Sequence, residues 1–115
     1  DVFENFLTRN QLEKHVRIEP LGFMRGRTFN ESFIIADEMQ NSTPNQMKML
    51  LTRLGENSQM IVMGDLKQSD LGPKNGLADL IKRIQGLELE HIEHVIMNED
   101  DILRHPAVAE ILRLY

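Results

Sequence analysis

Two adjacent carboxylates, Asp37 and Glu38, directly follow the apolar run from Phe33 to Ala36. Such a run is typical of a parallel strand buried on both faces, although a short run also fits the start of a buried helix. Successive strand side chains point to opposite faces, so the two acids would diverge and serve two partners. One could hold magnesium through water while the other orients or deprotonates a water nucleophile, as nucleotide hydrolysis requires. The alternative is that the pair only ends a strand and caps the next helix.

The elements that would position these acids follow in the sequence. Thr43-Pro44-Asn45-Gln46 has the residue types of a capping box with Pro at the first helical position. We expect a helix over about Pro44 to Leu54, with Gly55 as its left-handed stop. The apolar run from Gln59 to Met63 predicts the next buried strand. A strand–helix–strand unit of this length suits a parallel crossover.

Weaker periodic patterns predict the rest of the chain. The other expected elements are an amphipathic helix ending near Asn10, a strand from His15 to Glu19, a helix from Leu77 to Ile84, a strand from His91 to Met97 and a terminal helix opened by Pro106. Pro20 should end the strand from His15 to Glu19. Gly86 should end the helix from Leu77 to Ile84. The two glycines between Leu21 and Thr28 predict a loop.

Composition limits the class of protein. The chain has 115 residues, which is enough for one domain but short for a complete doubly wound nucleotide-binding domain, and both ends look cut. Hydrophobic residues make up 41% and charged residues 27%, with no run long enough to span a membrane. The absence of cysteine excludes disulfides and thiolate metal sites. A net charge of -5 argues against a wholly basic nucleic-acid surface.

A second polar segment, Gly64-Asp65-Leu66-Lys67-Gln68, follows the second predicted strand. Ligands of open α/β sheets bind at the carboxyl ends of parallel strands, so this segment and the acidic pair should share one edge. Gln68 offers both a donor and an acceptor, which suits a residue that monitors a terminal phosphate and its attacking water. Two such segments at one edge are more specific than either alone.

These segments resemble a known family. Met24-Arg25-Gly26-Arg27-Thr28, Phe33 to Asn41, Gly64 to Gln68 and Arg104-His105-Pro106 are similar, in order and spacing, to the PhoH-like ATPases. Those proteins are P-loop ATPases related to the core of superfamily-one helicases. The resemblance covers almost the whole chain and implies an incomplete α/β parallel-sheet P-loop NTPase fold.

The resemblance also implies roles for individual residues. Asp37 would coordinate Mg²⁺, Glu38 would be the catalytic base, and Gln68 would sense the terminal phosphate. Arg104 would stabilise transferred charge in the same or a neighbouring subunit. The residues expected to contact nucleotide are Gln40, Gly64 and Asp65.

The chain departs from the family pattern at three places. Met39 replaces the usual Ala, and the loop from Gly72 to Gly76 is shorter than the common bacterial form. No G-x-x-x-x-G-K-[ST] motif occurs, so the lysine and backbone cradle for phosphates are absent from this chain. We expect residues 1–115 to be the C-terminal part of a single ATPase domain. A strand that carries the missing motif would lie between Gln59–Met63 and His91–Met97.

Other candidate sites carry less specific signals. Arg25 and Arg27 suit phosphate of nucleotide or nucleic acid, or are ordinary surface arginines. His91 and His94 suggest a metal pair, but three residues apart on a strand they would face opposite sides. Lys74 in its Gly-rich loop is expected to be solvated.

The resemblance implies a protein that binds ATP and Mg²⁺ and hydrolyses ATP, coupled to RNA or another single-stranded nucleic acid, and we expect it to be cytoplasmic. The resemblance also implies a homo-oligomeric ring for the full-length protein, and the absence of a long apolar run predicts no membrane association. The alternative is a noncatalytic nucleic-acid-binding or assembly module that uses Arg25 and Arg27 and keeps the acidic strand as scaffold.

Overall fold

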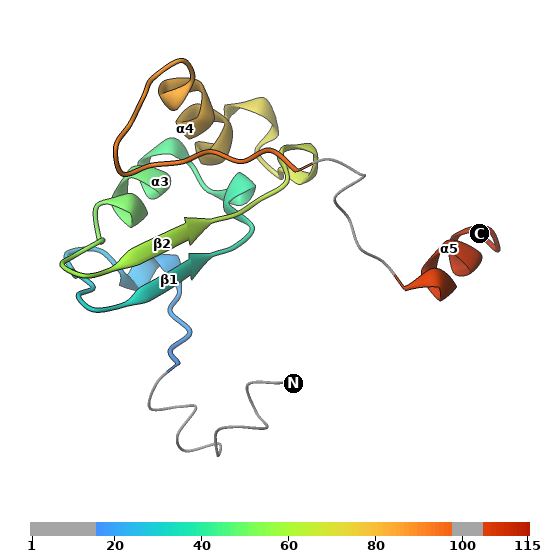
Figure 1. Ribbon diagram of the computed structural model, residues 1–115, viewed down its shortest axis with the longest axis horizontal. Helices are drawn as coiled ribbons and strands as arrows, with labels where there is room; N and C mark the ends of the chain where they lie inside the picture. The colour runs from blue at the N-terminus through green and yellow to red at the C-terminus, as the bar shows by residue number, and fades with distance from the viewer. Residues whose placement is uncertain (1–15, 98–104) are drawn as a thin grey trace. The chain divides into compact units, whose positions relative to one another are not determined.

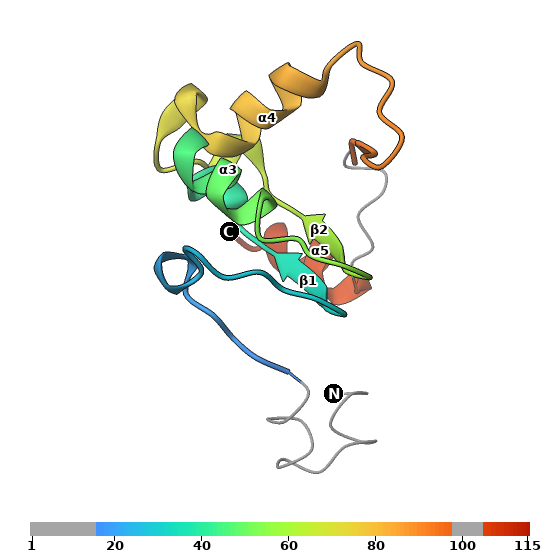
Figure 2. The same ribbon diagram turned by 90° about the vertical axis from the view of Figure 1, so that its left-hand side faces the viewer.

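The computed structural model describes residues 16–97 and 105–115, and the chain divides into two compact units, the first ending at Gln85 and the second beginning at Gly86. The first unit contains a parallel sheet of β1 (Phe33–Ala36) and β2 (Gln59–Val62). Helices α3 (Pro44–Leu51) and α4 (Gly76–Ile84) lie together on one side of this sheet (Figures 1 and 2). The predicted α/β class with parallel strands is confirmed.

The pairing of β1 with β2 fixes which residues lie side by side. Phe33 is opposite Gln59, and the register continues in parallel to Ala36 opposite Val62. Beyond the ladder, the Met63 amide donates to the Ala36 carbonyl at 2.8 Å, which extends the pairing by one hydrogen bond. The strand–helix–strand prediction for this part of the chain is therefore correct.

One face of the sheet contributes to the core. Strand side chains alternate between faces, so Ala36, its register partner Val62, and Met60 two residues before Val62 point to the same side. The buried apolar residues of the core are Met24, Ala36, Met39, Met47, Leu50 and Leu77. Helix α3 supplies two of them at i and i+3, the spacing of a single helical face.

The opposite face of the sheet is exposed. Phe33 is 60% exposed and Ile35 is 61% exposed, and Ile61 of β2 lies beside Ile35 in the register. The prediction that β1 is covered on both faces is therefore wrong for the described residues. Burial alternates along β1, which is the pattern of a strand packed on one side only.

Helix α3 begins as predicted and ends early. The Thr43 side chain accepts from the Gln46 amide at 3.1 Å, and the Gln46 side chain accepts from the Thr43 amide at 2.9 Å, which completes the capping box. The last helical residue is Leu51 instead of Leu54, because the Thr52 hydroxyl donates to the Lys48 and Met49 carbonyls and the chain leaves the helix there.

Gly55 does not have the left-handed backbone predicted for it. Its amide donates to the Phe29 carbonyl at 2.9 Å, and an added Cβ would lie 2.8 Å from that same oxygen. This glycine therefore permits a close approach of two backbone segments. Leu54 beside it forms a parallel bridge to Phe29.

Two predicted strands do not form in the described residues. Residues 16–20 and 87–97 have no regular secondary structure, and Ile92, Val95 and Ile96 are all exposed. A strand needs a partner for its backbone N–H and C=O groups, and neither segment pairs with a described one. The predicted helix before Asn10, and His15 in the first predicted strand, lie outside the described residues.

The remaining helices agree with their sequence signals. Helix α4 is capped by Asn75, whose side chain accepts from the Ala78 amide at 2.8 Å, and Gly86 beyond it has a φ of 78°. In the second unit, α5 (Pro106–Leu112) begins at the predicted proline, and His105 Nδ1 accepts from the Ala107 amide. Among the described helices, none has both the length and the apolar character needed to cross a membrane.

Candidate functional site at the carboxyl edge of the sheet

The carboxyl ends of β1 and β2 lead into two polar turns. The first turn comprises residues 37–42 and includes η2 (Met39–Asn41), and the second comprises residues 63–76 and includes η3 (Leu66–Gln68) and η4 (Gly72–Lys74). Because the strands are parallel, both turns leave the sheet at the same edge. This is the edge at which open α/β sheets bind ligands.

The backbone of the first turn changes direction at Glu38. Glu38 has a φ of 58° and a ψ of 32°, in the left-handed region that non-glycine residues rarely adopt. Such a conformation costs about 1–3 kcal/mol and persists only where neighbouring contacts enforce it. Glu38 is thus outside the extended strand, so strand alternation does not determine where its side chain points. Its amide donates to Asp37 Oδ1 at 2.8 Å.

Gln40 connects the first turn to the second. Its side chain is almost completely buried, with 1% exposure. Nε2 donates to Glu38 Oε2, and Oε1 accepts from the Asp65 amide at 3.1 Å. One amide therefore holds both the carboxylate of the first turn and the backbone of the second.

Further hydrogen bonds join the two turns in sequence order. The Met39 amide donates to the Met63 carbonyl at 3.0 Å, and the Gly76 amide donates to the Ser42 carbonyl at 2.7 Å. Between these, the Ser69 hydroxyl donates to the Gln40 carbonyl at 2.7 Å, and the Asp70 amide donates to Asn41 Oδ1 at 2.9 Å. We call these bonds, together with the Gln40–Asp65 bond, the edge network.

The edge network determines the course of the second turn. Gly64 lies against Gln40, where an added Cβ would be 2.5 Å from its Oε1 and 2.7 Å from Leu77 Cδ2. Asp65 then caps η3, its Oδ1 accepting from the Lys67 amide at 2.9 Å. Gln68 ends this short helix with an exposed side chain. The predicted nucleotide contacts of Gly64, Asp65 and Gln68 stay predictions, but all three lie at the predicted edge.

Asp37 has the chemistry that a magnesium ligand needs. Its side chain is exposed, and within residues 16–97 only Oδ1 is engaged, by the Glu38 amide. Mg²⁺ keeps several waters and is commonly held by one or two carboxylates together with substrate phosphates. The described residues contain no group of three or more acidic or histidine ligands. The donor set therefore fits Mg²⁺ bound through water and phosphate.

Of the predicted arginines that the structure describes, neither Arg25 nor Arg27 has a hydrogen bond or ion pair to either turn. Arg27 donates to Glu19 Oε2 at 2.9 Å, and its guanidinium lies 4.9 Å from the centre of the Phe29 ring. Both contacts engage the charge of Arg27, while Arg25 is exposed in the neighbouring turn. Arg104 lies outside the described residues, so its predicted role stays a prediction.

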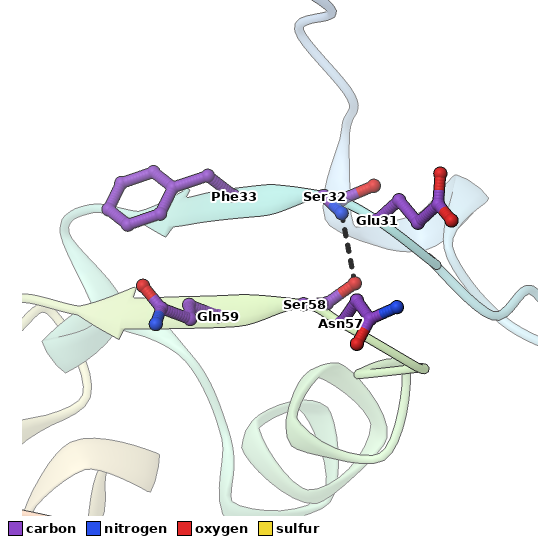
Figure 3. Close-up of a pocket in the computed structure, with 6 residues that line it drawn as sticks. All are labelled: Glu31, Ser32, Phe33, Asn57, Ser58 and Gln59. Carbon is purple, nitrogen blue, oxygen red and sulfur yellow. Dashed lines mark hydrogen bonds between the residues drawn. The ribbon is translucent and has the colours of Figure 1, made fainter.

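A hollow at the other edge of the sheet is part of the fold. It is lined by residues at the amino ends of both strands, namely Glu31, Ser32, Phe33, Asn57, Ser58 and Gln59 (Figure 3). Ser58 Oγ accepts from the Ser32 amide at 3.0 Å and donates to the Phe29 carbonyl at 2.8 Å. These bonds fasten the turns that precede the strands. The hollow lies at the amino ends of the strands, at the opposite edge from Asp37 and Glu38.

Sequence reasoning missed the structural residues of the site. Asn41, Ser42, Ser69 and Asn75 all contribute hydrogen bonds at this edge or to the cap that follows it. Their signal was a cluster of small polar residues after each strand, where loops commonly carry turn-forming side chains. Ser42 and Asn75 are also buried, which a sequence pattern alone does not reveal.

Parallel strands, a covering helix pair and two joined polar turns at the carboxyl edge define an α/β protein with a candidate ligand-binding edge. Comparison with known proteins assigns this chain more narrowly. The family model described as PhoH-like protein matches residues 2–115. The chain belongs to the PhoH-like protein family, as its resemblance predicted.

Individual relatives agree with this assignment. A PhoH-like protein of Bacillus subtilis is 46% identical over 105 residues, which cover 87% of this chain and 31% of that protein. A PhoH-like protein of Synechocystis is 43% identical over 105 residues, covering 87% of this chain and 30% of that protein. The protein PhoH of Escherichia coli K12 is 42% identical over 115 residues, covering 98% of this chain and 32% of that protein. The chain thus spans about a third of the length of these relatives.

Proposed function

We propose that the full-length protein containing this chain binds ATP with Mg²⁺ and hydrolyses it on a P-loop NTPase fold. The proposal rests above all on the Glu38 carboxylate, which Gln40 fixes at the carboxyl edge next to the polar second turn. Family membership supports the same activity. A carboxylate fixed at this edge suits a general base, which must be placed within hydrogen-bond reach of its water.

Each candidate residue, in the two turns or at Arg104, would have a separate role. Asp37 would hold Mg²⁺ through water, and the ion would neutralise charge on the phosphates. Glu38 would accept a proton from the water that attacks the terminal phosphorus, as the bond to the leaving diphosphate breaks. Gln68 would monitor the terminal phosphate with its exposed amide. Arg104 would stabilise the developing charge in the same or a neighbouring subunit.

The partners belong to the same proposal. ATP turnover would be coupled to RNA or another single-stranded nucleic acid, in a homo-oligomeric ring located in the cytoplasm. Support comes from family membership and from Arg25, whose exposed side chain is accessible to a phosphate backbone.

Substitution of Glu38 tests the proposed activity. In the full-length protein, Glu38→Gln should leave nucleotide affinity near the wild-type value and slow ATP turnover by about two to four decades, the usual effect of losing a general base. Glu56→Gln is the matched control, because Glu56 is exposed in the turn before β2, at the opposite edge.

Turnover should be measured with and without single-stranded RNA or DNA, and affinity by calorimetry. Wild-type turnover in Glu38→Gln would exclude Glu38 as the base. No turnover in the wild type, together with nucleic-acid binding lost in Arg25→Ala, would indicate the noncatalytic module instead.

A further inference from the structure

Gln40 has the environment of a residue that acts through its neighbours. It is 1% exposed, so a bound nucleotide could not reach its side chain without rearrangement of the first turn. Both ends of its amide are engaged, one by the Glu38 carboxylate and the other by the Asp65 amide. Buried polar groups are expensive to leave unpaired, so these two contacts hold each other in place.

The chemistry of the two partners allows only one orientation of this amide. The Asp65 backbone N–H is a donor and must face Oε1. Nε2 must then face Glu38, whose ionised carboxylate can only accept. The orientation of the side chain therefore follows from its partners and not from an arbitrary choice between oxygen and nitrogen.

The backbone increases the dependence of Glu38 on this contact. Glu38 has left-handed φ and ψ, and its amide is bound by the preceding Asp37 side chain. Its carboxylate is held by Gln40, which is itself bound to the second turn through Oε1 and, at its carbonyl, by Ser69. The direction of the acid is thus tied to the turn that carries Gln68.

We propose that Gln40 is a positioning residue that aligns the Glu38 carboxylate with the second turn, so that the base and the phosphate-monitoring turn move as one unit. This inference rests on the proposed ATPase function and replaces direct nucleotide contact by Gln40 with an action through Glu38. A displacement of about 1 Å at a reacting group can cost on the order of 100-fold in rate. Loss of the bridge should therefore lower turnover without removing any group that touches substrate.

A double-mutant cycle in the full-length protein tests the inference. Gln40→Met keeps the volume and removes both hydrogen bonds, so it should lower kcat by about 10- to 100-fold while changing KM by less than about threefold. In the Glu38→Gln background the same substitution should have almost no further effect on kcat, because the residue it positions is already inactive. Equal losses in both backgrounds would overturn the inference and indicate a structural role.

Asn75→Leu is the matched control for the loss of a buried amide. Asn75 is also 1% exposed, and its amide joins the Gly72 carbonyl to the Ala78 amide without touching Glu38. Any effect of Asn75→Leu on kcat should therefore be the same in both Glu38 backgrounds.

A second variant and an independent measurement cover the possibility that Gln40→Met does not fold. Gln40→Glu keeps an acceptor for the Asp65 amide but presents a carboxylate to Glu38, so it should lower kcat in the same way. Hydrogen exchange at the Asp65 amide should accelerate in Gln40→Met and stay unchanged in Glu38→Gln. Unchanged exchange in folded Gln40→Met would show that Gln40 does not hold the second turn. Wild-type protein without ATP turnover would refute the proposed function. If turnover depends on Glu38 but kcat is unchanged by substitution of Gln40, only this inference is refuted.

Discussion

Gly64 illustrates how one residue of the site serves the fold. It was expected to contact nucleotide, yet the space where its side chain would be is filled by Gln40 and Leu77. Its backbone has no left-handed requirement, so the reason for glycine here is the close approach of the two turns. Gly64 has no side chain. Its role in the close packing of the two turns is therefore compatible with a role of its backbone in binding phosphate.

Gly64→Ala should destabilise the protein. The added methyl would lie 2.5 Å from Gln40 Oε1, so one of the two turns must shift, and overpacking of this kind costs about 1–3 kcal/mol. Urea unfolding of the full-length protein measures the change. Gly22→Ala is the control, because a Cβ there meets no described atom within 4 Å. Equal stability of Gly64→Ala and wild type would mean that the two turns are not closely packed.

At the scale of elements, features that depend on neighbouring residues are predicted better than features that depend on contacts between residues far apart in sequence. The start of α3 is predictable from the sequence because the capping box involves only neighbouring residues, from Thr43 to Gln46. The shared edge of β1 and β2 followed from the general rule for strand–helix–strand units. The early end of α3 at Leu51 was not predictable in this way, since Gly55 is a strong stop signal that the chain uses for contact with Phe29 instead.

The wrong strand predictions have a physical cause. Alternating or continuous apolar residues show that a segment can pair, but pairing depends on a partner far away in sequence. The segment from His91 to Met97 has the pattern and lacks a described partner. The bridging role of Gln40 was unpredictable for a related reason, because it depends on side-chain direction and on a residue 25 positions away.

Removal of the α3 cap should be measurable. Thr43→Ala loses the acceptor for the Gln46 amide and should lower the free energy of unfolding by about 1 kcal/mol. Thr52→Ala at the other end should change stability less, because both contacts of its hydroxyl are exposed and the Lys48 carbonyl already accepts from the Thr52 amide. Denaturant unfolding of both variants in the full-length protein gives the comparison, and a larger loss in Thr52→Ala would contradict it.

At the scale of the whole molecule, the sheet leaves apolar surface uncovered in the described residues. Phe33 and Ile35 of β1, with Ile61 of β2, form a continuous exposed strip on the face away from α3. Exposed apolar surface on a narrow sheet favours association between chains.

Residues 1–115 expressed alone should therefore associate, and they should bind ATP weakly or not at all, because the chain contains no phosphate-cradling lysine motif. Light scattering and calorimetry with Mg-ATP measure the two properties. Ile35→Lys should reduce association by placing a charge in the strip, while the exposed control Glu56→Lys should not. A monomer that binds ATP at micromolar concentration would contradict this expectation and the assigned position of the missing strand.

The left-handed backbone at Glu38 has a consequence for selection experiments on this protein. The residue best suited to a φ of 58° is glycine, which carries no acid, so the least strained backbone at this position and the glutamate carboxylate exclude each other. A library randomised at position 38 and screened for folded protein would apply no pressure to keep the acid. The same library screened for turnover would retain it despite the strain. Variants collected by the first screen are therefore unsuitable as a guide to which residues the second would keep.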